Sequence, residues 1–126
     1  MDERCTMETF SCCDGGMQLH FKNGYTLSIL NEPFNGPYPV GERESYPFVE
    51  ITVFCSTEDC YVHFGRDLVR DAWEQYTIKV TPHQLVKYLA AVEKFKPKKK
   101  SLIGDGPSQL SYLLGRLRWD EWNKGR

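Results

Sequence analysis

The sequence lacks the features that would assign it at once to several classes of protein. No apolar run approaches the roughly 20 residues that cross a bilayer, so we expect no membrane span. The N-terminus has no apolar signal core, so we expect a cytoplasmic location in which the five cysteines stay reduced. Phosphate-binding glycine motifs, paired-carboxylate signatures and metalloprotease motifs are also missing. We therefore expect a protein that is not an enzyme and has no cofactor.

What the sequence does have is a pronounced separation of charge. Residues 1–93 carry seven basic and fourteen acidic side chains, a net charge of −7, whereas residues 94–126 carry nine basic and three acidic, a net charge of +6. Such polarity favours steering toward a charged partner and does not bear on the fold. The length of 126 residues and the hydrophobic fraction of 40% are typical of one globular unit. We therefore expect a single domain over residues 1–126.

A β-hairpin is predicted around Asn23-Gly24. Residues 17–21 and 25–29 alternate apolar and polar side chains, and Asn-Gly is a strong signal for a tight turn between strands. A two-residue loop would mix the two faces of the hairpin. A three-residue loop, with the glycine at the left-handed bulge position, pairs Phe21 with Tyr25 and places every apolar side chain on one face. We therefore predict the longer loop.

A second hairpin is predicted from Phe48 to Phe64, with a four-residue turn at 56–59. The register that follows pairs Cys55 with Cys60, Val53 with Val62 and Ile51 with Phe64. The opposite, outer face then carries Phe54 beside Tyr61 and Thr52 beside His63. Because the helices are expected on the other face, the aromatic patch of Phe48, Phe54 and Tyr61 predicts a homodimer interface.

Two segments show no usable periodicity. Residues 1–16 are predicted to form an irregular arm. Residues 31–47 contain four prolines and two glycines, which exclude a helix or a central strand. Two interpretations of this long loop stay open: it packs over the sheet through Phe34 and Tyr38, or it is a binding loop.

The C-terminal part predicts two helices. Thr81-Pro82-His83-Gln84 is a capping box with proline at the first helical position, and Pro97 ends the helix that follows. Its expected apolar stripe is Leu85, Val86, Leu89, Val92 and Phe95. The second helix is predicted from Ser108 to near Trp122, with one face formed by Leu110, Leu113, Leu114 and Leu117. With a short strand at 76–80, the fold class is α+β: an antiparallel sheet of two hairpins plus this strand, and two C-terminal helices packed on one face.

The cysteines and histidines give weak chemical signals. Cys55, Cys60 and His63 resemble half of a zinc site, but Cys60 and His63 are three residues apart on an extended strand and point to opposite faces, so we expect no metal. A Cys55–Cys60 disulfide is geometrically possible, and the reducing compartment disfavours it. His20 and His63 are each expected on the polar face opposite a threonine, which is ordinary surface chemistry. No catalytic residue is therefore predicted.

The basic segment, residues 94–126, is the remaining functional signal. The predicted partner-binding residues are Lys96, Lys98, Lys99, Lys100, Arg116, Arg118, Trp119 and Trp122, together with Phe54 and Tyr61 of the second hairpin. Positive charge beside aromatic rings suits nucleic acid or an acidic protein surface. Two structural interpretations also remain: the segment packs on the acidic body, or it is a solvated helix end. The acidic body would repel a long phosphate backbone, which favours a protein partner.

Three stretches carry a resemblance: Phe21–Ile29, Val49–Phe54 and Val80–Val86. Their Asn-Gly hairpin, VEITVF-like strand and V-x-P-x-x-V-like helix start resemble small uncharacterised proteins of bacteriophages and mobile elements. The resemblance covers residues 17–95 and includes no catalytic motif. It implies a non-enzymatic viral protein that evades host defence by binding and inhibiting a host or defence protein, as anti-CRISPR proteins do, in the cytoplasm of the host cell. The alternative is a nucleic-acid-binding accessory protein that uses the basic C-terminal segment.

Overall fold

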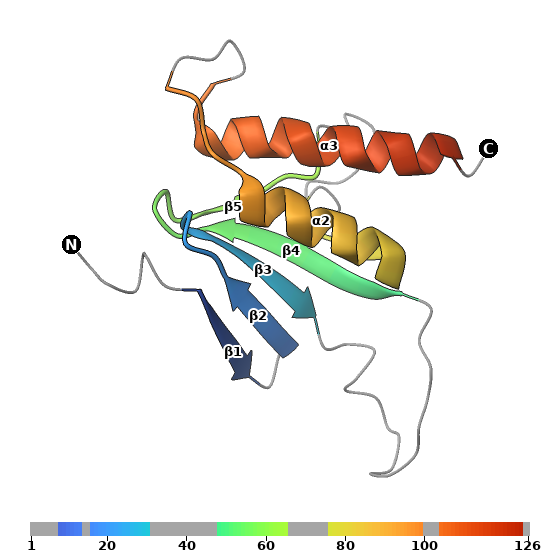
Figure 1. Cartoon of the computed structure of the whole chain (residues 1–126), viewed down its shortest axis with the longest axis horizontal. Coiled ribbons are helices and arrows are strands. Elements are labelled where there is room, and N and C mark those ends of the chain that lie inside the picture. The colour runs from blue at the N-terminus through green and yellow to red at the C-terminus, as the bar shows by residue number, and fades with distance from the viewer. Residues whose placement is uncertain (1–7, 14–15, 31–47, 66–75, 100–103, 125–126) are drawn as a thin grey trace.

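The computed structural model describes residues 8–13, 16–30, 48–65, 76–99 and 104–124. Within them, six strands form one antiparallel sheet, and two helices lie on one of its faces (Figure 1). The elements are β1 (Thr9–Cys13), β2 (Gly16–His20), β3 (Tyr25–Leu30), β4 (Val49–Cys55), β5 (Cys60–Val62), β6 (Ile78–Val80), α2 (Pro82–Lys94) and α3 (Gly106–Lys124). This confirms the predicted α+β class. None of the described helices is long and apolar enough to cross a membrane.

The first hairpin, β2–β3, has the predicted three-residue loop. The Phe21 N–H donates to the Tyr25 carbonyl at 2.9 Å, the Gly24 N–H donates to the Phe21 carbonyl at 3.1 Å, and Gly24 has a φ of 88°. A residue with a side chain is strained at such a positive φ, so the glycine is required there. The apolar face of the hairpin is turned toward the helices, and Tyr25 and Leu27 are buried in the core.

The second hairpin is confirmed only at its turn end. Cys55 pairs with Cys60 and Val53 with Val62, but β5 ends at Val62, so the predicted Ile51–Phe64 pair is wrong. Ile51 pairs with Ile78 of β6 instead. The seven-residue β4 thus shares one edge between β5 and β6, because each of these strands is only three residues long. Phe64 is still buried in the core after the strand has ended.

The prediction of an irregular arm over residues 1–16 is wrong at residues 9–13. Residues Thr9–Cys13 form β1, which pairs antiparallel with β2 so that Cys13 faces Gly16 across a two-residue connection, Asp14-Gly15. The alternation of Phe10 and Cys12 with Ser11 is the strand signal, and Asp-Gly is a tight-turn signal. The predicted loop over 31–47 lies outside the described residues.

α2 begins at the predicted capping box. The Gln84 N–H donates to Thr81 Oγ1 at 3.2 Å, and the Thr81 N–H donates to Gln84 Oε1 at 2.9 Å. The predicted stripe is wrong at Val86, which is exposed, because the buried positions are Tyr88 and Val92. Val86 follows Leu85 directly and is therefore turned about 100° away from it around the helix axis.

α3 packs against α2 and β5, whereas α2 packs against β3 and β6. β1 and β2 project beyond the helices, so the helical layer covers only part of the sheet (Figure 1). At Gly115, the backbone of α3 lies against the backbone of Gly65, which follows β5. A Cβ added at Gly115 would lie 2.7 Å from the Cα of Gly65. Leu110 and Leu114 are buried as predicted, but Leu113 is exposed because the buried stripe of the helix is narrower than predicted.

Candidate partner-binding surfaces

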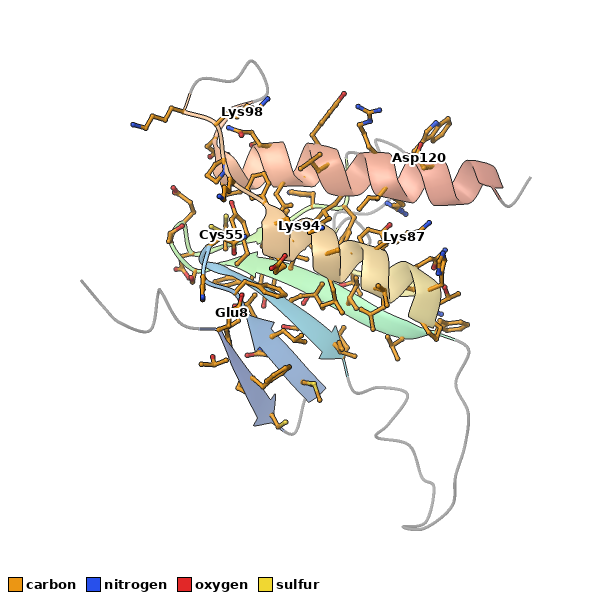
Figure 2. All side chains as sticks on the ribbon, viewed as in Figure 1. Glu8, Cys55, Lys87, Lys94, Lys98 and Asp120 are labelled. Atoms are coloured by element: carbon orange, nitrogen blue, oxygen red, sulfur yellow. The ribbon has the colours of Figure 1, made fainter. Side chains whose placement is uncertain are left out.

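The connection between α2 and α3 carries the lysine cluster and is held by one buried glutamine. Gln109, which is 7% exposed, accepts a hydrogen bond from the Lys98 N–H at 2.7 Å and donates to the carbonyls of Lys98 and Gly104, each at 2.9 Å. The side-chain amide of Gln109 thus satisfies backbone donor and acceptor groups of the connection, as the peptide group of a neighbouring strand would. The Lys96, Lys98 and Lys99 side chains are exposed, and Lys98 projects at the N-terminal end of α3 (Figure 2). Gln109 therefore holds the backbone of Lys98 in place.

Asp105 ends this connection and caps α3. Its carboxylate Oδ1 accepts a hydrogen bond from the Ser108 N–H at 3.0 Å, and its carbonyl accepts one from the Gln109 N–H at 2.9 Å. The hydrogen bonds from Ser108 hold the pKa of Asp105 below its usual range, because they stabilise the ionised form. The cap therefore stays negatively charged within the basic connection.

The outer face of α3, defined here as Tyr112, Arg116 and Trp119, is exposed to solvent. Tyr112 is 50% exposed and Trp119 is 59% exposed, and Arg116 between them is exposed as well. Their spacing of four and three residues places them on one side of a helix. The helix therefore carries large apolar groups on both sides: leucines toward the core and two aromatic rings away from it.

Arg118 does not belong to this outer face, although it was predicted to bind the partner. Its Nη1 donates to the Phe64 carbonyl at 3.3 Å, which satisfies a backbone group after β5 has ended. Arg118 thus holds α3 on the sheet beside the close approach of Gly65 and Gly115. Lys100 and the side chain of Trp122, also predicted to contact the partner, lie outside the part of the chain that is described.

The sheet separates Phe54 and Tyr61 from the basic segment. Because Val53, Cys55 and Val62 point into the core, Phe54 and Tyr61 between them point to the helix-free face. Their rings contact each other edge to face, with centroids 5.1 Å apart, and Tyr61 contacts Tyr76 at 6.1 Å. The ten predicted partner-binding residues therefore do not form one surface.

The outer aromatic residues also cover one another, which reduces the patch that predicts a homodimer. Phe54 is half-buried, and the Lys79 ammonium lies 4.9 Å from the centroid of the Phe48 ring. Such a cation–π contact shields one face of the ring. The rings of Phe48 and Tyr61 remain exposed, and a homodimer through this face remains a prediction.

His63 does not pair with Thr52 in the sheet, because β5 ends one residue earlier. Its ring instead lies 4.1 Å from that of Tyr76, centroid to centroid, with the planes tilted by 38°. Nδ1 of His63 is buried and has no hydrogen-bond partner among the described residues.

His20 lies at the centre of a cross-strand hydrogen-bond network. Nε2 lies 2.8 Å from Ser11 Oγ of β1, and Nδ1 lies 2.9 Å from Thr26 Oγ1 of β3. Since the Ser11 hydroxyl donates to Gln18 Oε1 at 3.3 Å, we assign the Nε2–H tautomer, which donates to Ser11 and accepts from Thr26. A nucleophilic serine would donate to the histidine instead, and a carboxylate would orient the ring. The network ties three strands together and does not activate Ser11.

Cys12, Cys55 and Cys60 are free thiols. Cys12 is exposed, Cys55 is buried and Cys60 is half-buried, and the Cys55 Sγ lies 3.2 Å from Thr57 Oγ1. Burial, and then the neighbouring Cys55, raise the pKa of the Cys60 thiol. Among the residues described, no three His, Cys, Asp or Glu side chains are grouped to hold a metal ion.

Sequence reasoning missed two features. Tyr112 was absent from the predicted site, although its spacing from Arg116 and Trp119 on a predicted helix was a signal for it. The strand β1 was missed because the short Thr9–Cys13 segment was assigned to an irregular arm. Comparison with protein-family models, with curated proteins and with solved structures finds no match to the chain.

Proposed function

We propose that the chain is a non-enzymatic binding protein that engages an acidic surface of a partner protein through the outer face of α3. The observation that carries the proposal is the exposed row of Tyr112, Arg116 and Trp119. Tyrosine, tryptophan and arginine are the residues that most often dominate binding energy at protein interfaces. A helix that only had to pack on the sheet would need one apolar stripe, and α3 has a second.

Charge favours an acidic partner. Arg116 lies in the row itself, and Lys98 lies at the N-terminal end of the same helix (Figure 2). The Gln109 clamp supports this interpretation, because a fixed backbone reduces the entropy lost when Lys98 meets a carboxylate. Nucleic acid is the weaker candidate, since residues 1–93 carry a net charge of −7 and would repel a long phosphate backbone.

The finer role, inhibition of a host or defence protein by a phage-encoded protein, rests on the resemblance of residues 17–95. An inhibitor needs a rigid surface and no catalytic residues. The direction of the hydrogen bonds around His20 is compatible with that role, because it leaves Ser11 unactivated.

The test compares surface variants in a pull-down from host lysate treated with nuclease. The α3 variant combines Tyr112→Ser, Arg116→Glu and Trp119→Ser, and the control combines Phe48→Ser and Tyr61→Ser on the helix-free face. We expect wild type and control to retain the same stoichiometric protein and the α3 variant to lose it. Titration of the purified partner should then give an affinity that falls at least about 30-fold in the α3 variant, since truncating a central anchor costs about 2 kcal/mol or more.

Two outcomes would contradict the proposal. A partner lost from the control but retained by the α3 variant would place binding on the outer sheet face. Association that disappears with nuclease, and a DNA or RNA affinity that falls steeply with salt, would favour the nucleic-acid alternative. Unfolding curves of both variants must match wild type, which is expected because all the substituted side chains are solvent-exposed.

A further inference from the structure

Within the part of the chain that the structure describes, β1 is an edge strand of the sheet with no strand on its outer side. Among the described strands it pairs only with β2, and Glu8, Thr9, Phe10 and Cys12 are exposed, Phe10 to 75%. Sheet edges are usually blocked by lysine, proline or a bulge, because their free backbone groups pair with other strands. The sequence of β1 contains none of the blocking residues.

The hydrogen-bond parity of the sheet identifies which backbone groups face outward. The Phe21 N–H donates to Tyr25 of β3, and bonded and non-bonded pairs alternate along an antiparallel ladder. Leu19 of β2 therefore bonds toward β3, whereas Gln18 and His20 bond toward β1. Their β1 partners are Ser11 and Thr9. The N–H and C=O groups of Phe10 and Cys12, between and beyond these partners, consequently point away from the sheet.

Side chains hold this edge in place and make it apolar on one face. On the helix-free face, Ser11 bonds to His20 of β2, which in turn bonds to Thr26 of β3, so side chains connect the edge strand through β2 to β3. On the other face, Phe10 and Met17 are exposed, because β1 and β2 project beyond the helices (Figure 1). The outward N–H and C=O groups of β1 are therefore already in position to bond an added strand, and an exposed apolar surface lies beside them.

We propose that the β1 edge binds an extended segment of a partner protein as an additional antiparallel strand, with apolar residues at alternate positions and basic residues at its ends. The backbone groups of Phe10 and Cys12 supply the hydrogen bonds, and the Phe10 ring packs against the apolar side chains of the added strand. Charge sets the preference for basic ends. Glu8 lies exposed just before the strand (Figure 2), and it is the only charged side chain among the described residues 8–13. Opposite charges across neighbouring strands are favourable.

The probe is the synthetic peptide acetyl-Lys-Val-Thr-Val-Thr-Val-Lys-amide, and the measurement is amide hydrogen exchange of the full chain by NMR. Binding should protect the amides of Phe10 and Cys12 and leave those of Thr9 and Ser11, which already bond to β2, unchanged. A matched peptide with glutamate at both ends should bind about tenfold more weakly. No change at Phe10 and Cys12 with millimolar lysine peptide would overturn the proposal.

Variants separate the edge from other surfaces. Cys12→Pro removes an outward N–H without breaking a bond to β2, so it should abolish peptide binding with the fold intact. Cys12→Val keeps the N–H and should bind as wild type. Phe10→Lys offers a second route, because it adds a repelling charge and removes the ring. Protection of the same amides that rises with protein concentration and needs no peptide would assign the edge to a second copy of the chain and refute a partner strand.

Discussion

The outer face of α3 and the edge of β1 offer two different kinds of contact. The backbone of a helix is satisfied within the helix, so α3 can only present side chains: Tyr112, Arg116 and Trp119. The edge strand presents backbone groups as well. Its side chains add an apolar surface, and Glu8 adds a negative charge just before the strand. Side chains select a partner by shape and charge, whereas an edge accepts any compatible extended segment. The difference predicts that single substitutions affect α3 binding strongly and edge binding mainly when they remove a backbone donor.

The charge of the two regions is opposite as well. The lysines of the α2–α3 connection and Arg116 make the α3 side basic, while Glu8 marks an acidic edge. The two sites belong to different elements, because β1 and β2 project beyond the helices (Figure 1). The substitutions below each remove one contact that orders α2 or α3. The hydrogen exchange of the β1 amides serves as the reference that should not change.

The largest effect is expected at Gly115, where α3 meets the sheet. Alanine in place of glycine inside a helix normally stabilises a protein by about 1 kcal/mol. Here the added Cβ would lie 2.7 Å from the Gly65 backbone, which cannot give way as a flexible side chain would. We expect Gly115→Ala to lower the free energy of unfolding by about 2–3 kcal/mol, measured by urea denaturation. Ser111→Ala on the same helix is the control, and a stabilised Gly115→Ala would contradict the close packing.

The next effect concerns Gln109 and the connection that carries the lysines. Gln109→Leu removes one acceptor and two donor contacts and leaves the Lys98 and Gly104 carbonyls unpaired. We expect a loss of about 2–3 kcal/mol in the free energy of unfolding. The rate of amide hydrogen exchange should rise at Lys98 and remain unchanged in β1. Gln109→Asn keeps the amide but is too short, so it should behave like the leucine variant; wild-type stability in either would contradict the clamp.

A smaller effect is expected at Asn23, which connects the first hairpin to α2. Its Nδ2 donates to the carbonyls of Val92 at 2.7 Å and Phe95 at 3.0 Å, and its Oδ1 accepts from the Tyr25 N–H at 3.1 Å. Asn23→Ala should cost about 2 kcal/mol in thermal or urea unfolding. Asn23→Asp keeps the acceptor and loses the donors, so it should be destabilised as much. If only the alanine variant is destabilised, the hairpin contact dominates and not the helix contact.

Asn23 also shows what the sequence could and could not predict. Its turn was predictable, because hairpin loops depend on neighbouring residues and on a period of two. Its bonds to α2 were not, because they join residues 69 and 72 positions apart. The same distinction applies to β4, whose division between β5 and β6 depends on tertiary contacts, and to Arg118, whose inward direction depends on the end of β5. The basic character of residues 94–126 was predictable, because it follows from the amino-acid composition of that segment. Its separation from Phe54 and Tyr61 was not, because it depends on which face of the sheet the helices cover.

The smallest effect is expected at Asp105, the acidic cap of α3 in the basic connection. The cap is bonded to the Ser108 N–H, and Asp105→Ala should cost about 1 kcal/mol at neutral pH. The pKa of Asp105 is lower in the folded chain than its ordinary value, so its contribution is complete above that ordinary value. It should be lost as the pH falls through the lower, folded pKa, since protonation removes the charged acceptor. The stability difference between wild type and Asp105→Ala should therefore shrink in acid.

Asp105→Asn separates the cap from its charge. Asparagine also caps helices well, so this variant should keep most of the neutral-pH stability and lose the acid dependence of this site. The measurement is urea unfolding of the three proteins between about pH 2 and pH 7, a range that spans the titration of an ordinary aspartate. A difference between wild type and Asp105→Ala that stays constant across this range would show that the carboxylate does not titrate with folding. Because the cap begins the helix that carries Tyr112, Arg116 and Trp119, acid should loosen the start of α3 while the uncharged backbone donors of β1 remain in place.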